Sequence, residues 1–228
     1  MTENPWDIPP LPQKGDDAHS MTFEAVGRAT SEWEHLEAYL GLAFAVFVGA
    51  TNTVDAAMRA YGSIVAFKGR SGMLQAAAEV FFNDFPSDSL QDRFNKLDKA
   101  AGRFSGRRNE IAHGIVQPYY AINGEAHVGA ALVPSYFATN KRLLESVDGD
   151  EYSSRLTLKY AYTSVEITNF SEQFAKLAKE ALELYKALSG HRAAEVRRKH
   201  ASKLARLLVE PPPQSSETEG PNLKDQPE

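Results

Sequence analysis

One long run of apolar residues at helical spacing constrains this chain more than any other feature. Between Ser89 and Ile115 the apolar positions are Leu90, Phe94, Leu97, Ala101, Phe104, Ile111 and Ile115. Residues three and four positions apart share one face of a helix, so the run predicts a helix that is buried along one side. Position 108 belongs to this face and holds arginine. Because a guanidinium is costly to bury without partners, Arg108 indicates a pairing network or a cleft that receives an anion.

Similar periodic segments elsewhere predict a mainly α protein, an antiparallel helical bundle of about five to six helices. The expected helices cover about 21–48, 54–65, 73–85, 89–113, 164–189 and 192–209. We expect the glycines between Gly69 and Gly72 to separate the second helix from the third. Thr163 and Glu166 have the spacing of a capping box before the fifth helix, and Gly190 suits its C-terminal cap.

The segment after the fourth helix has a different character. β-prone residues from Tyr119 to Val133 surround Asn123-Gly124, which is a strong signal for a hairpin turn. The alternating apolar residues from Leu156 to Tyr162 are candidates for a third strand. We therefore expect a small β-hairpin or three-strand insert at about 116–163, with a polar excursion around Asp148–Asp150.

The composition of the two ends predicts their organisation. Residues 1–20 contain four prolines and predict a mobile Pro-rich arm, with Trp6 and Ile8 as possible anchors. Residues 21–190 form the predicted bundle with its β insert. Residues 191–209 form a basic C-terminal helix that suits either an acidic partner or RNA, or an ordinary solvated surface. The polar and Pro-rich residues 210–228 predict a disordered tail.

Several classes of function are disfavoured by composition. The chain has no cysteine, and its histidines lack ligand spacing, so we expect neither a metal site nor a cofactor. The net charge of −5 provides no general attraction to nucleic acid, so such binding must use a local patch. No basic-then-apolar leader opens the chain and no uninterrupted apolar run is long enough for a membrane span, so we expect a cytoplasmic protein without a membrane partner.

The residues around Arg108 are suited to phosphodiester chemistry. Arginine holds phosphate oxygens, and histidine takes or gives a proton near neutral pH. Asn109 and His113 are four residues apart and share a helical face, whereas Arg108 and His113 are about 140° apart. Both can serve one small site only if the arginine wraps around, the helix tightens near Gly114, or a second subunit completes the site.

A row of cations lies opposite the apolar stripe of the same helix. Within about 120° of one another on an ideal helix are Arg93, Lys96, Lys99, Arg103 and Arg107. The row is either a solvated face or a track that binds the phosphates of RNA. Lys96, Lys99, Arg103 and Arg107 are therefore candidate RNA-binding residues.

The stretch Arg108-Asn109-Glu110-Ile111-Ala112-His113 resembles the Arg-x(4–6)-His motif of HEPN domains. The motif identity covers six positions, and the architectural resemblance covers about residues 20–190. It implies a homodimer whose two motifs share a cleft, and metal-independent endoribonuclease chemistry in which the ribose 2′-hydroxyl attacks the adjacent phosphate. Arg108 would bind the phosphate, His113 would act as general acid or base, and Asn109 would orient either group.

The resemblance also bears on partners. Many HEPN proteins act in toxin–antitoxin or antiviral defence systems, which implies a possible antitoxin or defence-system partner. In the branch whose toxins a nucleotidyltransferase modifies, a tyrosine stands two residues after the histidine. Ile115 occupies that position, so we do not predict that control.

Two other interpretations remain open. The same helices could form a non-catalytic HEPN-like module that binds RNA, a nucleotide or a protein partner. Alternatively, Arg108 could be a structural arginine paired with a carboxylate of the first helix, for which Glu32, Glu34 and Glu37 are candidates.

Overall fold

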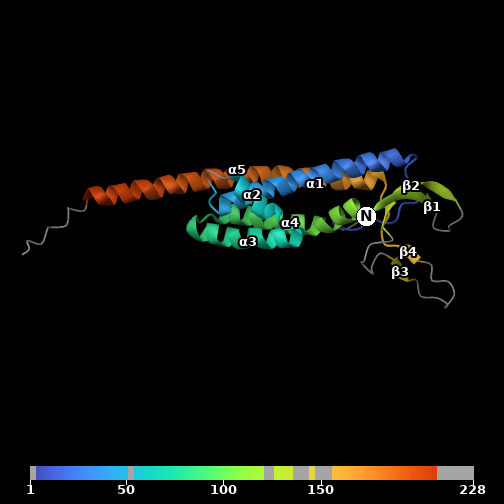
Figure 1. The fold of residues 1–228 in the computed structure, drawn as a ribbon, viewed down its shortest axis with the longest axis horizontal. Coiled ribbons are helices and arrows are strands. Elements are labelled where there is room, and N and C mark those ends of the chain that lie inside the picture. The colour runs from blue at the N-terminus through green and yellow to red at the C-terminus, as the bar shows by residue number, and fades with distance from the viewer. Residues whose placement is uncertain (1–3, 51–53, 121–125, 136–143, 147–155, 210–228) are drawn as a thin grey trace, which may run out of the picture. The chain divides into compact units, whose positions relative to one another are not determined.

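The computed structural model describes residues 4–50, 54–120, 126–135, 144–146 and 156–209. Within these ranges lie five helices and two small antiparallel sheets (Figure 1). In chain order the elements are α1 (His19–Phe47), α2 (Val54–Gly62), α3 (Phe67–Asp84), α4 (Asp88–His113), β1 (Ile115–Tyr120), β2 (His127–Val133), β3 (Leu144–Ser146), β4 (Leu156–Leu158) and α5 (Ser164–Val209). The prediction of a mainly α fold with a small β insert after the fourth helix is confirmed.

The chain divides into two compact units, residues 1–192 and 193–228, each considered by itself. The first unit holds α1 to α4, the strands and the first part of α5. The described part of the second unit is the C-terminal part of α5. None of the described helices contains a stretch with the length and apolar character needed to cross a membrane.

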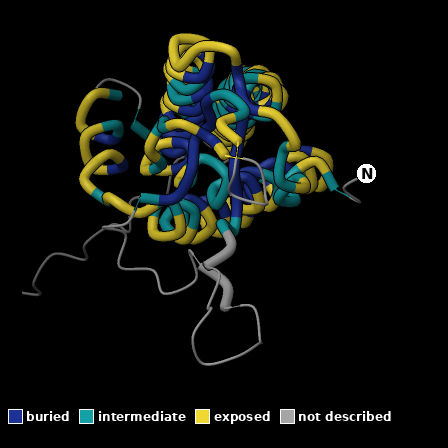
Figure 2. Tube along the Cα trace, turned by 90° about the vertical axis from the view of Figure 1, so that its right-hand side faces the viewer, coloured by how far each residue is buried: buried dark blue, intermediate teal, exposed yellow. Residues whose placement is uncertain are grey.

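Aromatic side chains join the helices of the first unit around Trp33 of α1. Trp33 is fully buried, and its ring centroid lies 5.1 Å from that of Phe174 in α5 and 5.3 Å from that of Phe67 in α3. Phe104 of α4 contacts Phe174 from another side. Buried segments of several helices consequently meet in one interior, with exposed residues outside (Figure 2).

The apolar stripe of α4 forms its buried face, as its spacing predicts. Its buried apolar residues are Leu90, Phe94, Leu97, Ala101, Phe104 and Ile111. Ile115 departs from the pattern, because it is 38% exposed and belongs to β1.

The predicted break at Gly69–Gly72 is wrong. α3 already begins at Phe67 and runs through both glycines. Side chains between the glycines explain this, because Arg70 Nη1 lies 2.7 Å from Glu37 Oε2 and the Ser71 hydroxyl donates to Asp98 at 2.8 Å. These contacts hold the first turns of α3 against α1 and α4, and they offset the low helix propensity of glycine.

The predicted hairpin is present, although its strands differ from the expected set. β1 and β2 pair antiparallel from Ile115 opposite Val133 to Tyr120 opposite His127. The turn signal Asn123-Gly124 and the excursion Asp148–Asp150 lie outside the described residues. β4 pairs with β3 in a separate sheet, so the prediction of a third strand in the hairpin sheet is wrong for Leu156–Leu158.

A short bridge connects the hairpin to the residues just before α5. Tyr162 and Leu132 exchange backbone hydrogen bonds of 2.8 and 2.9 Å. The capping box that precedes α5 is confirmed, because the Thr163 N–H donates to Glu166 at 2.8 Å and the Val165 N–H donates to the Thr163 hydroxyl at 3.3 Å. The start of α5 is therefore fixed both locally and by β2.

The segment before α1 follows the surface of the bundle and the hairpin. Trp6 and Ile8 pack against the core, as expected of anchoring residues. Further along, Asp16 and Ala130 exchange backbone hydrogen bonds of 2.7 and 2.8 Å, which adds a residue pair to the edge of β2.

The predicted helix end at Gly190 is wrong, because α5 continues to Val209. The expected fifth and sixth helices are therefore one helix. His191 lies 3.2 Å from the carbonyl oxygen of Phe85, and Arg192 donates to the carbonyl oxygen of Gly49 at 3.3 Å. These contacts hold the residues after Gly190 in a helical path.

Candidate functional site

The candidate site lies at the C-terminal end of α4, beside α1. Arg108 Nη2 lies 3.3 Å from Glu34 Oε1, and Arg108 Nη1 donates to Asn109 Oδ1 at 3.2 Å. The side chain of Arg108 is 29% exposed and that of Glu34 is 64% exposed. The guanidinium therefore lies at the rim of the core, and its contacts with Glu34 and Asn109 are with groups that face solvent.

His113 is the last residue of α4, and Asn109 precedes it by one turn; both are exposed. α4 remains α-helical to His113, so the helix does not tighten there. Arg108 and His113 consequently keep the separation of about 140° that five helical residues impose. Asn109 occupies the position between them, bonded to Arg108 and on the same face as His113.

Gly114 ends α4 in an extended conformation, with φ of −76° and ψ of 167°. Its φ is accessible to any residue, so the glycine is needed for another reason. A Cβ atom at this position would lie 2.7 Å from Leu132 Cγ and 2.9 Å from the carbonyl oxygen of Glu110. The glycine lets the end of α4 approach β2 closely, which fixes where His113 lies.

Arg107 has a structural environment that differs from that of its neighbour. Its side chain is only 12% exposed, and Nη2 lies 2.8 Å from Glu110 Oε1. Its Nε atom is buried without a hydrogen-bond partner among the described residues. Arg107 therefore does not lie on an exposed track, in contrast to its predicted place in the cationic row.

The partner of Arg107 belongs to a buried polar network that the sequence patterns did not indicate. The Tyr162 hydroxyl donates to Glu110 Oε2 at 2.5 Å, and the Tyr160 hydroxyl donates to the Glu110 carbonyl oxygen at 3.4 Å. The two tyrosine rings stack with centroids 4.9 Å apart. In the sequence, Tyr160 and Tyr162 contribute only to the alternating pattern that predicts a strand, and that pattern gives no indication of a contact with Glu110.

Burial controls the electrostatics of this network. Burial raises the pKa of Glu110 above its ordinary value, although the Tyr162 hydrogen bond and Arg107 act in the opposite direction. Burial and the nearby Glu110 charge also raise the pKa of Tyr162, so its hydroxyl stays protonated and donates. The network ties the last turns of α4 to the residues before α5.

The other cationic candidates divide into two groups. Lys96 and Lys99 are exposed on α4. The guanidinium of Arg103 lies over the ring of Trp6, with its central carbon 4.2 Å from the ring centroid. The N-terminal segment therefore lies on part of the row, whereas Lys96 and Lys99 are exposed, as is Arg93 of the same row.

No group of three or more His, Asp or Glu side chains within the described ranges is arranged to hold a metal ion. No protein-family model, no curated protein and no solved structure matches the chain.

Proposed function

We propose that the protein is an endoribonuclease of the HEPN type that cleaves RNA as a homodimer in the cytoplasm. The observation that carries this proposal is the contrast between two consecutive arginines. Arg107 is largely buried against Glu110, whereas Arg108 lies at the surface with Asn109, one turn before the exposed His113. One arginine holds the helix in place, and the other is available to an anion.

The pair between Arg108 and Glu34 is consistent with ligand binding. Glu34 is mostly exposed and its oxygen is 3.3 Å from the guanidinium. Exposed ion pairs contribute little to stability because water screens both charges. A phosphate that binds two guanidinium nitrogens at once is a better partner, so it would displace Glu34 at small cost.

The proposed reaction uses His113 for proton transfer. The ribose 2′-hydroxyl attacks the adjacent phosphorus, the P–O5′ bond breaks, and a 2′,3′-cyclic phosphate and a 5′-hydroxyl form. His113 takes the proton from the 2′-hydroxyl as general base, and a protonated His113, either the same residue or that of the second copy, gives a proton to the leaving 5′-oxygen as general acid. Arg108 stabilises the charge on the non-bridging oxygens. Asn109 orients the Arg108 guanidinium, from which its side-chain oxygen accepts a hydrogen bond.

A second copy of the chain would complete the site. Within one chain α4 stays helical to its end, so Arg108 and His113 point about 140° apart. Two copies that meet along their exposed α4 ends would place the arginine of one motif near the histidine of the other. An antitoxin or defence-system partner would be a further component of this function.

Cleavage of single-stranded RNA in the presence of EDTA tests the proposal. Wild-type protein should produce cyclic phosphate ends, and Arg108→Ala and His113→Ala should each reduce the rate by about a hundredfold or more. Arg28→Ala and His19→Ala are matched controls, because both residues are exposed and lie outside the motif. Equal rates in all variants, or no cleavage by wild type at high concentration, would refute the catalytic proposal.

A non-catalytic module that binds through the same surface is the second candidate. The ion pair between Arg108 and Glu34 is consistent with it, because an arginine that pairs with a carboxylate of α1 can have a structural role in place of a catalytic one. This alternative predicts binding of RNA, a nucleotide or a protein without turnover, and unchanged binding in His113→Ala. Glu34→Gln separates the two, because it should leave cleavage intact if the pair is displaced by substrate and should lower stability if the pair is structural.

A further inference from the structure

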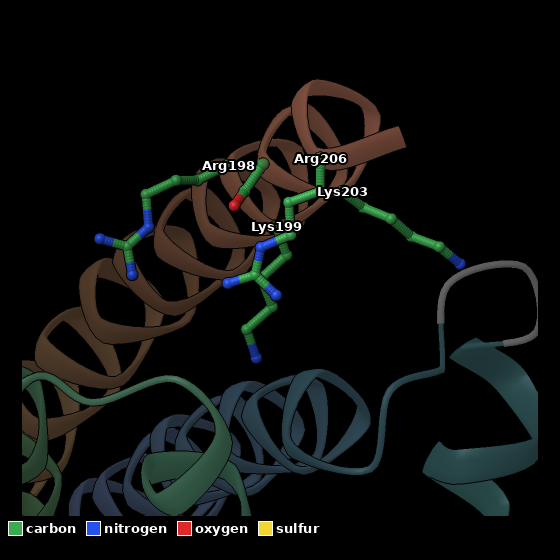
Figure 3. A pocket seen from close by; sticks show the side chains of 5 residues that line it. Arg198, Lys199, Lys203 and Arg206 are labelled. Carbon is green, nitrogen blue, oxygen red and sulfur yellow. The ribbon is translucent and has the colours of Figure 1, made fainter. Parts of the chain in front are cut away.

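The C-terminal part of α5 carries one strongly basic face. Between residues 193 and 209 five side chains are cationic and one, Glu195, is acidic. Five residues line a shallow open pocket on this segment: Arg198, Lys199, Ser202, Lys203 and Arg206 (Figure 3). All five are exposed. The segment therefore presents a local positive surface on a chain whose net charge is −5.

The spacing of these residues forms a continuous surface along the helix. Arg198, Ser202 and Arg206 follow one another at intervals of four residues, and Lys199 and Lys203 form the adjacent row. From Arg198 to Arg206 the helix rises about 12 Å. This length places cations beside several consecutive phosphates of an extended strand, and the Ser202 hydroxyl lies in the middle, where it can donate to a phosphate oxygen.

The chemistry of the face favours the phosphodiester backbone of a nucleic acid as its ligand, over a protein or a membrane surface. Protein interfaces depend on apolar or aromatic anchors near their centre, and none of the described side chains that line this pocket is apolar. Membrane-surface helices carry aromatic and leucine side chains on an apolar face. Residues 193–209 contain no aromatic residue, and neither Val196 nor Leu204, whose side chains the structure describes, lines the pocket.

We propose that the face formed by Arg198, Lys199, Ser202, Lys203 and Arg206 binds the phosphate backbone of single-stranded nucleic acid without reading its sequence. This site is separate from the α4 motif and does not rest on the proposed cleavage. In a nuclease it would raise the local concentration of substrate, and in a non-catalytic module it would be the binding site itself.

Fluorescence anisotropy with a labelled oligothymidylate of about 12 nucleotides tests the proposal. DNA lacks the 2′-hydroxyl, so binding is measured whether or not the protein cleaves RNA. With four cationic contacts the affinity should fall about 50-fold between 50 and 200 mM salt, following a slope of about 0.7 per contact. Lys203→Gln with Arg206→Gln removes two contacts, so this double variant should bind more weakly at 50 mM and lose only about sevenfold over the same range.

Lys176→Gln with Lys179→Gln is the matched control, since it removes two exposed lysines from another part of α5. It should retain wild-type affinity and salt dependence, and circular dichroism should show unchanged helicity in both double variants. Equal losses in the two variants would mean that net charge alone is responsible, which would overturn the proposal. So would an absence of binding by wild type at 50 mM salt, or binding to phosphatidylserine vesicles in place of the oligonucleotide.

Discussion

The Tyr162 hydroxyl donates a hydrogen bond to Oε2 of Glu110 at 2.5 Å, and this contact joins the last turns of α4 to the residues just before α5. Tyr162→Phe would leave that carboxylate oxygen without its donor. We expect a loss of about 1.5–3 kcal/mol in the free energy of unfolding, the usual range for a hydrogen bond to a charged group. Urea denaturation of the wild type and the variant measures this difference in the free energy of unfolding. Tyr120→Phe, at a tyrosine that is 54% exposed, should be close to neutral, and an equal loss in both variants would contradict the assigned role of the contact.

The buried carboxylate should also make stability depend on pH. Burial raises the folded-state pKa of Glu110 above its ordinary value of 4.5, so the folded state binds this proton more tightly than the unfolded state does. The stabilising contribution is therefore complete below pH 4.5 and is lost as pH rises through the folded-state pKa.

Glu110→Gln removes this titration while keeping nearly the same shape. Relative to this variant, wild-type protein should lose stability as the pH rises from below 4.5 through the raised folded-state pKa of Glu110. Other titrating groups cancel in the comparison. Unfolding free energies of the two proteins across this range provide the measurement, and a constant difference would show that Glu110 does not titrate abnormally.

Any side chain at Gly114 should destabilise the protein. In Gly114→Ala the new methyl group would lie 2.7 Å from Leu132 Cγ and 2.9 Å from a backbone oxygen, so β2 or α4 must shift. We expect a loss of about 1–3 kcal/mol, typical of overpacking. Gly106→Ala is the matched change inside α4, where the added carbon would meet no described atom within 4 Å beyond its chain neighbours and the backbone of its own helix, and it should stabilise the protein by about 0.5–1 kcal/mol. Thermal melts compare the two variants, and a stabilising Gly114→Ala would be inconsistent with the close approach.

Asp16 should be among the most important polar residues of the fold. It is buried, and it accepts hydrogen bonds from the Thr22 hydroxyl at 2.5 Å and from the Ser164 backbone N–H and hydroxyl at 2.8 Å each. The carboxylate thereby caps the first residue of α5. Asp16→Ala should cost about 2–4 kcal/mol, since three donors lose a charged acceptor.

The next residue supplies the control for that substitution. Asp17 pairs with Lys14 at the surface, where both side chains are largely exposed. Asp17→Ala should leave the midpoint of urea denaturation unchanged. If the two variants behaved alike, Asp16 could not be the residue that caps α5.

The sequence predicted those parts of the fold whose cause lies within one helix. The stripe from Leu90 to Phe104 needs only the helical period, and the Thr163 and Glu166 capping box needs only local spacing. Gly190 was misleading because helix propensity is weak, and the contacts of His191 and Arg192 with distant backbone oxygens outweigh it.

The candidate site shows the same division. The motif residues Arg108, Asn109 and His113 could be identified from sequence, and Glu34 was among the proposed partners of the arginine. The surroundings of Arg107 and Arg108 are the reverse of those predicted, because the helical period places position 108 on the apolar stripe and position 107 in the cationic row opposite it. Which arginine is buried depends on Glu110 and Tyr162. Tyr162 lies 52 residues after Glu110 in the sequence, so the helical pattern of α4 could not indicate this contact.

The two tryptophans lie in different environments, so their intrinsic fluorescence can report on two parts of the protein. Trp33 is fully buried and contacts α3 and α5. Trp6 is partly exposed and contacts Phe104 and Arg103 of α4. Indole emission shifts to longer wavelength when the ring meets water, so the intrinsic fluorescence contains one signal from the interior and one from the N-terminal segment. Trp6→Phe would leave only the interior signal, and the difference between the two spectra would report release of the N-terminal segment while the bundle is still folded.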